Sequence, residues 1–197
     1  MLNLKTGDIL LFNNNKKNSI LNILSSLIKY GTHSNYTHIG MVLKNPTFIN
    51  KSLRGTYVWE SGMEKVNDNM KFGVQITPID ELVKYYNSNC VFVRQVECDS
   101  KLFSDDILKK INDDVHDKPY DINPVDWIEA LIGKDLNPQK TDRFFCSALV
   151  GYIYTKCGLL KRETDWSILT PSDFSLDGEN LDFMENVKLG DSEILYK

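Results

Sequence analysis

The sequence predicts an α+β fold, in which helices pack against an antiparallel sheet. Short apolar runs typical of strands and longer amphipathic segments typical of helices follow one another in a mixed order. The chain has 197 residues, of which 42% are hydrophobic, and this is enough to bury a core without disulfide or metal support. Because no linker, repeat or low-complexity segment divides it, we expect one domain over residues 1–197.

In the first half of the chain, the strands are predicted from apolar runs and the helix from apolar residues at helical spacing. Gly31 follows the helix as a C-cap, and Asn45-Pro46 and Ser61-Gly62 are expected to end the second and third strands. The predicted elements are, in order, a strand over 9–12, a helix over 18–30, a strand over 38–43 and a strand over 55–60.

In the second half, two helices have clear starting signals. Thr77 is expected as the N-cap of a helix with Pro78 at its first position, and Ser104 is expected to cap another. The other predicted elements are a strand over 90–96, helices over 124–132 and 144–157, and a strand near 183–189.

Charge and motifs exclude several function classes. The net charge is −4, so the whole chain has no electrostatic signature of nucleic-acid binding. The N-terminus lacks the pattern of a signal peptide, and no apolar run approaches the roughly 18 residues of a membrane span. Phosphate-loop, dinucleotide, zinc-protease and serine-hydrolase motifs are absent from the sequence, and we expect no cofactor.

The four cysteines and three histidines are poorly spaced for a structural metal site. Cys90 and Cys98 are eight residues apart, and there is no CxxC pair. His33 and His38 are the one pair at a suitable spacing, so we expect no metal. The cysteines are expected to be free thiols, as in a reducing compartment.

Cys146 is the candidate nucleophile. It is expected in the first turn of the apolar helix over 144–157, where the positive end of the helix dipole stabilises a thiolate. The first-turn N–H groups there have no partner within the helix, so they can hold an oxyanion. The alternative is that Cys146 is an ordinary buried cysteine.

His38 is the candidate base. His116 lies in a charged stretch and His33 in a polar loop, so both are expected to be solvated. His38 begins an apolar strand, which would fix its backbone while the ring projects into a cleft. If the strands at 38–44 and 56–60 pair antiparallel, Glu60 at the end of the second lies about one strand spacing, ~5 Å, from His38. A carboxylate there can orient an imidazole.

Four short motifs in a fixed order carry a resemblance to a known family. They are Leu4-Lys5-Thr6-Gly7-Asp8-Ile9-Leu10, Tyr36-Thr37-His38-Ile39-Gly40-Met41-Val42, Val58-Trp59-Glu60-Ser61 and Phe145-Cys146-Ser147-Ala148-Leu149-Val150. With weaker matches at Lys118-Pro119-Tyr120-Asp121 and Leu169-Thr170-Pro171-Ser172-Asp173, they resemble the circularly permuted NlpC-type papain-like cysteine peptidases. The resemblance covers roughly residues 4–175 and is to the YiiX/YebB-like branch, which has bacterial and poxviral members.

The resemblance implies a permuted papain-like fold in which base and orienting residue precede the nucleophile. It matches Cys146 to the nucleophile, His38 to the general base and Glu60 to the polar third residue. Ala148 departs from the pattern, which has an acidic residue there. Tyr36 and Tyr120 are candidate residues lining the cleft, with packing as the equal alternative.

We therefore expect a thiol hydrolase, and the substrate stays open between a peptide or isopeptide amide and an acyl lipid. The helix over 18–30, with lysines beside it, could contact a membrane surface, although packing on the core is the commoner use of such a helix. The alternative function is a catalytically silent binding or virion-associated module. The expected location is cytoplasmic or virion-associated, and the oligomeric state does not follow from the sequence.

Overall fold

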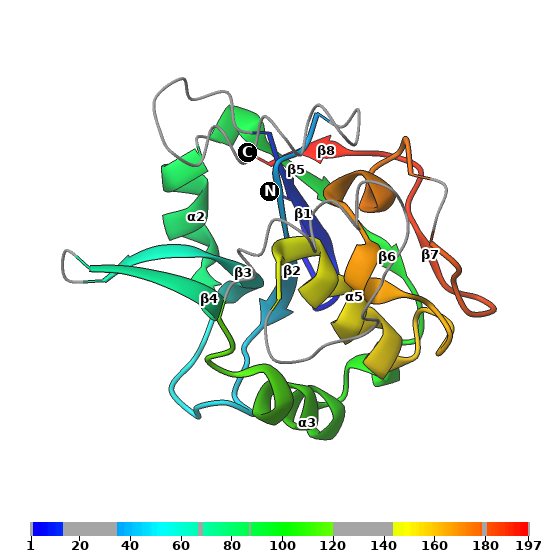
Figure 1. Ribbon diagram of the computed structural model, residues 1–197, viewed down its shortest axis with the longest axis horizontal. Coiled ribbons are helices and arrows are strands. Elements are labelled where there is room, and N and C mark those ends of the chain that lie inside the picture. The colour runs from blue at the N-terminus through cyan, green and yellow to red at the C-terminus, as the bar shows by residue number, and fades with distance from the viewer. Residues whose placement is uncertain are drawn as a thin grey trace.

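The computed structural model describes residues 2–13, 35–66, 69–86, 88–119, 144–178 and 181–196 (Figure 1). Its strands are β1 (Ile9–Phe12), β2 (His38–Lys44), β3 (Thr56–Val66), β4 (Asn69–Pro78), β5 (Val91–Arg94), β6 (Val96–Glu97), β7 (Lys188–Leu189) and β8 (Ile194–Leu195). Its helices are α2 (Ile79–Tyr86), α3 (Asp105–Val115) and α5 (Cys146–Cys157). Short 3-10 helices are η1 (Ser88–Cys90), η2 (Ser100–Phe103), η3 (Trp166–Ile168) and η4 (Pro171–Phe174).

Within these residues the chain is α+β, with a six-stranded sheet in the order β4-β3-β2-β1-β5-β8. Every strand pair of this sheet is antiparallel, as the sequence predicted. A separate pair joins β6 and β7. The long β3–β4 hairpin extends beyond the other strands, to the left in Figure 1.

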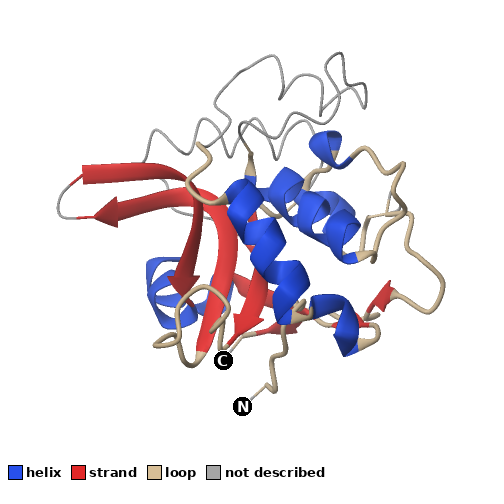
Figure 2. Cartoon of the chain, turned by 90° about the horizontal axis from the view of Figure 1, so that it is seen from below, coloured by secondary structure: helices blue, strands red, loops and turns tan. Residues whose placement is uncertain are grey.

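Helices cover both faces of the sheet (Figure 2). On one face, Met41 and Trp59 pack with the buried side of α5 and with α3 in the larger core. On the other face, Val42 and Val58 pack with Ile79 of α2 in a smaller core. Successive residues of a strand point to opposite faces, so the two cores alternate along β2 and β3.

Helix α5 is the most buried α-helix of the described chain. Ten of its twelve residues are buried, which matches its nearly continuous apolar sequence. It ends at Gly158, whose φ of +78° is the left-handed conformation that glycine adopts without strain. It begins at Cys146, two residues later than predicted, and Cys146 is in the first turn as expected.

The strand that carries Glu60 is longer than predicted. Ser61 and Gly62 were expected to end it, but β3 continues to Val66 and β4 follows as a strand that the sequence analysis missed. Both residues fit within a strand because Ser61 has a buried hydrogen-bond acceptor and Gly62 lies where there is no room for a side chain. Turn-forming residue types were therefore a misleading signal at this position.

Two other boundaries differ from the predictions. Thr77 and Pro78 belong to the end of β4, and α2 begins at Ile79, because the Thr77 hydroxyl bonds to Glu60 and does not cap the helix. The predicted strand over 90–96 is split into β5 and β6, with Cys90 in η1. The predicted helices over 18–30 and 124–132 lie outside the described residues.

The single domain over 1–197 stays a prediction. Among the described residues, no helix has both the length and the apolar character needed to cross a membrane.

Candidate active site

The His38 and Glu60 side chains form a buried hydrogen-bonded pair. His38 Nε2 lies 2.5 Å from Glu60 Oε2, and the exposed fractions of the two residues are 6% and 2%. The antiparallel register of β2 and β3 produces this contact, because Met41 pairs with Trp59 and the strands run in opposite directions from there. The start of β2 therefore lies beside the segment of β3 that contains Glu60, as the sequence analysis expected.

The second oxygen of Glu60 is held from β4. Thr77 Oγ1 donates a hydrogen bond of 2.9 Å to Glu60 Oε1, and Gln75 Nε2 donates one of 3.2 Å to the same atom. The two carboxylate oxygens thus have different partners: β4 contacts Oε1 and the imidazole contacts Oε2.

The Cys146 side chain lies within hydrogen-bond reach of the His38 ring. Cys146 is 2% exposed and is the first residue of α5. Phe145 occupies the N-cap position and makes no side-chain bond to the first turn. The positive end of the α5 dipole is therefore directed at the segment that carries the thiol.

His38 has a perturbed pKa. Burial by itself lowers the pKa of an imidazole, but hydrogen bonds to Cys146 and to Glu60 outweigh it and raise the pKa of His38 to about 10. The ring is therefore positively charged at neutral pH, with the Glu60 carboxylate as its buried partner.

Two aromatic rings flank the imidazole. The Tyr86 ring, from the last residue of α2, is stacked on His38 with an interplanar angle of 4° and a centroid distance of 5.6 Å. The Phe12 ring lies 5.3 Å from His38 and 4.5 Å from Tyr86. These rings limit the orientations that are open to the imidazole.

One hydrogen bond connects the strand of Glu60 to the segment that leads into Cys146. Ser61 Oγ donates to the carbonyl oxygen of Phe144 at 2.6 Å, in a buried position.

Gly62 lies next to the His38–Glu60 pair, since a Cβ there would be 3.0 Å from Glu60 Oε2 and 3.4 Å from His38 Cε1.

A search of solved structures finds the crystal structure of the metalloprotein yiiX from Escherichia coli O157:H7, DUF1105. The sequence identity is 18% and the TM-score 0.54, over 96% of this chain and 98% of that chain. The two proteins share a fold. No protein-family model matches the chain, and the search of curated proteins finds no match either.

The yiiX neighbour is called a metalloprotein, so we compared this chain's donor groups with the needs of a metal site. In the part of the chain that the structure describes, no group of three or more His, Cys, Asp or Glu side chains could hold a metal ion. The described residues therefore do not fit a metal site.

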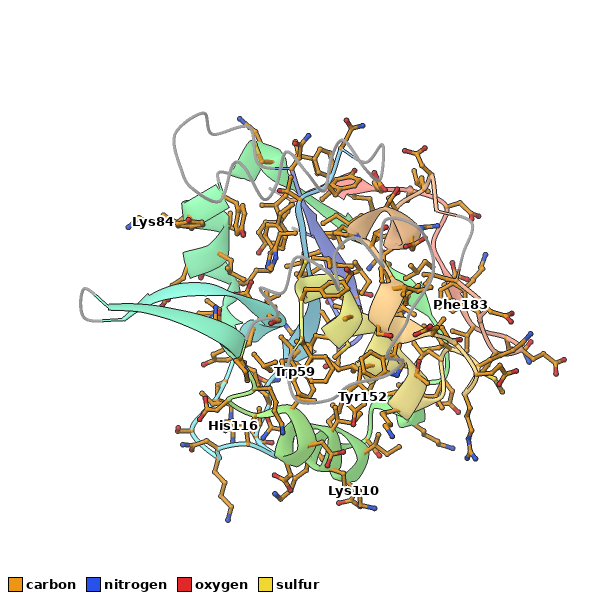
Figure 3. All side chains as sticks on the ribbon, viewed as in Figure 1. Trp59, Lys84, Lys110, His116, Tyr152 and Phe183 are labelled. Atoms are coloured by element: carbon orange, nitrogen blue, oxygen red, sulfur yellow. The ribbon has the colours of Figure 1, made fainter. Side chains whose placement is uncertain are left out.

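Each of the remaining candidate residues either contacts other groups or lies outside the described residues. The Tyr36 hydroxyl donates to Glu193, and its ring packs on Phe92, so both of its ends are in contact with the protein. His116 is solvated beside Asp117, as predicted, and lies near one end of α3 (Figure 3). Tyr120 and His33 lie outside the described residues.

The sequence analysis missed the residues that surround the pair. Thr77 was interpreted as a helix cap and Ser61-Gly62 as a strand end, while Gln75 and Tyr86 were not considered. The available signal was period-two alternation, which places Gln75 and Thr77 on one face of a strand once the strand is recognised.

Proposed function

We propose that the chain is a thiol hydrolase of the permuted papain-like type, with Cys146 as nucleophile, His38 as general base and acid, and Glu60 as the residue that orients His38. One observation carries the proposal: the His38 ring contacts Glu60 through Nε2 and also lies within hydrogen-bond reach of Cys146. Since Nε2 is occupied by Glu60, Nδ1 is the ring nitrogen left for the thiol.

The chemistry is acyl transfer in two steps. His38 holds the proton, so the Cys146 sulfur attacks the substrate carbonyl carbon as a thiolate and forms a tetrahedral oxyanion, which first-turn N–H groups of α5 stabilise. The bond to the leaving amine or alcohol breaks as His38 gives that group its proton. Water then attacks the thioester, releasing the carboxylic acid and the free thiol.

The substrate class is either a peptide or isopeptide amide or an acyl lipid, because papain-like folds serve both kinds of chemistry. The predicted membrane contact through residues 18–30 belongs to the second class, and the cytoplasmic or virion-associated location stays a prediction.

The burial of all three side chains favours the alternative, a catalytically silent binding module. Cys146, His38 and Glu60 have exposed fractions of 2%, 6% and 2%, so a substrate reaches the sulfur only if the site opens. The two functions differ in whether Cys146 is reactive in the folded protein.

The test is the pH dependence of iodoacetamide alkylation at each cysteine, measured by mass spectrometry. Cys157 is an internal reference, because burial and the nearby Cys98 raise its pKa to about 12. A hydrolase site predicts fast alkylation of Cys146 below pH 7, lost in His38→Ala and reduced in Glu60→Gln. The matched control is His116→Ala, which removes a solvated histidine and should change nothing.

If Cys146 reacts as slowly as Cys157 in every variant, the hydrolase proposal is wrong and the binding module leads. If Cys146 shows fast, His38-dependent alkylation, the next step is to identify the substrate class. Peptide-amide, isopeptide and acyl-ester probes are then compared between wild type and Cys146→Ala. Full turnover by Cys146→Ala would also overturn the proposal.

A further inference from the structure

Side chains of β4 donate hydrogen bonds to Glu60 Oε1, the carboxylate oxygen that does not contact His38. In the β3–β4 register Glu60 pairs with Gln75 and Val58 pairs with Thr77. Gln75 and Thr77 are two residues apart, so they share one face of β4 with Glu60 on the neighbouring strand. Their side chains reach the same atom, Glu60 Oε1.

We propose that Thr77 and Gln75 are positioning residues, which hold the Glu60 carboxylate in the one orientation that presents Oε2 to His38. The inference rests on the proposed function, since it concerns how the orienting residue of that triad is itself oriented.

Glutamate needs such a restraint more than a shorter residue does. Its carboxylate is carried on a flexible chain, and fixing that chain in one rotamer is entropically unfavourable. Both β4 groups donate a hydrogen, and a carboxylate oxygen only accepts, so the donor set suits Oε1. With Oε1 held from one side and Oε2 bound to His38, rotation of the carboxylate would break three hydrogen bonds together.

The Gln75 amide supports a dedicated role. Its Oε1 atom is buried and has no hydrogen-bond partner among the described residues, although an unsatisfied buried acceptor is unfavourable. Turning the amide over would place that oxygen against the Glu60 carboxylate and lose the Nε2 bond. The hydrogen bond to Glu60 therefore determines the orientation of the amide, although this orientation leaves the Gln75 side-chain oxygen without a hydrogen bond.

The titration midpoint of the His38 imidazole reports whether Glu60 is held in this orientation. Among the described residues, the titratable groups that face it are Glu60 from β3, Cys146 from α5 and Tyr86 from α2. If Glu60 turns away, the imidazolium loses its carboxylate partner while its other neighbours stay in place, and its titration midpoint falls.

The experiment titrates His38 by NMR in the full chain labelled with ¹³C-histidine. The sequence has three histidines, so His38→Ala and His116→Ala assign the signals. Thr77→Val keeps the side-chain shape and removes the donor. We expect it to lower the His38 midpoint by about one pH unit, Thr77→Ser to restore it, and Gln75→Leu to lower it by less, because that hydrogen bond is longer.

The matched control is Thr155→Val. The Thr155 hydroxyl also makes a 2.9 Å hydrogen bond, but its acceptor is the Gly151 carbonyl within α5 and not a group of the proposed triad. A structural role for Thr77 predicts that both variants lower the melting temperature and leave the His38 midpoint unchanged, which would overturn the inference. Thr77→Ser and Gln75→Leu keep the test decisive if Thr77→Val does not fold.

Failure of this inference is distinguishable from failure of the proposed function. If wild-type Cys146 shows fast, His38-dependent alkylation but Thr77→Val titrates like Thr155→Val, only the positioning role is wrong. If Cys146 is unreactive in the wild type, the hydrolase proposal is wrong, and the His38 midpoint still reports whether Thr77 orients Glu60.

Discussion

The Ser61 hydroxyl donates a hydrogen bond to the carbonyl oxygen of Phe144, across 83 positions of the chain. Ser61 follows Glu60 in β3, and Phe144 lies two residues before Cys146. The bond therefore ties the strand that orients the imidazole to the segment that carries the thiol. The position of Cys146 relative to Glu60 and His38 therefore depends on this long-range contact.

Removing this bond should affect stability and Cys146 reactivity together. Ser61→Ala leaves a buried carbonyl without its donor, so we expect a loss of about 1–3 kcal/mol in the free energy of unfolding. We also expect slower alkylation of Cys146, because its segment is no longer anchored to β3. Urea denaturation and the alkylation rate measure the two effects.

Ser175→Ala is the matched control for this change. It removes a 2.7 Å bond from another buried serine to a backbone carbonyl, that of Ser172. It should be destabilising and leave Cys146 alkylation unchanged. An equal change of alkylation in both variants would show that Ser61 acts through general stability alone.

Gly62 should tolerate no side chain. In Gly62→Ala the methyl group would lie 3.0 Å from Glu60 Oε2 and 3.4 Å from His38 Cε1, so it must displace one of them. We expect Cys146 alkylation below pH 7 to fall by about tenfold or more, which corresponds to about 1.4 kcal/mol or more of displacement.

The comparison for Gly62 is Gly190→Ala, whose nearest neighbour would be the Gln95 carbonyl oxygen at 3.3 Å. This change should leave the alkylation rate of Cys146 as it is. Wild-type reactivity in Gly62→Ala would mean that the His38–Glu60 pair is not as closely packed as described.

Tyr86 should stabilise the charged form of His38. Its ring is stacked on the imidazole, and an aromatic face attracts a cation by about 0.5–2 kcal/mol. Tyr86→Leu should therefore lower the NMR titration midpoint of His38, while Tyr86→Phe, which keeps the ring, should preserve it. Tyr85→Leu is the control, because Tyr85 is 49% exposed and its ring contacts Tyr86 edge-on. Equal midpoints in Tyr86→Leu and Tyr86→Phe would contradict this role.

The stability of the protein should fall in alkaline solution through His38. The pKa of His38 is about 10 in the folded chain and about 6.5 in the unfolded chain. Its contribution is thus fully present below pH 6.5 and is lost as the pH rises through 10. Between these values His38 holds one more proton in the folded state than in the unfolded state, and this group alone lowers the free energy of unfolding by up to about 1.4 kcal/mol per pH unit.

The measurement is urea denaturation from pH 6 to pH 10 for wild type and Glu60→Gln. Without the carboxylate partner the pKa of His38 is no longer raised by that bond, so the variant should show a shallower decline. Parallel declines in the two proteins would assign the alkaline loss of stability to other groups.

The elements that carry His38, Glu60 and Cys146 were predictable because their signals are local. The apolar run from His38 predicts β2, the apolar stretch after Phe145 predicts α5 with Cys146 at its start, and both agree with the structure. The hairpin argument for Glu60 was also correct, since it needs only two neighbouring strands and their direction. Local periodicity and element ends are properties of a short window of sequence.

The residues around the His38–Glu60 pair were not predictable in the same way, because their contacts depend on the register of strands and on distant packing. Thr77 has the residue type of a helix cap, and it bonds to Glu60 only because β4 pairs with β3 in one register. Ser61 has the residue type of a turn, and its acceptor lies on a segment far along the chain.

Local pattern therefore determines which segments become strand or helix and where a reactive side chain sits within each. The selection of partners across those segments is non-local: it needs the closed sheet, the docking of α5 and the burial that leaves Glu60 with His38, Thr77 and Gln75 as its neighbours. A buried polar group needs hydrogen-bond partners, and these come from segments that are adjacent only in the folded chain.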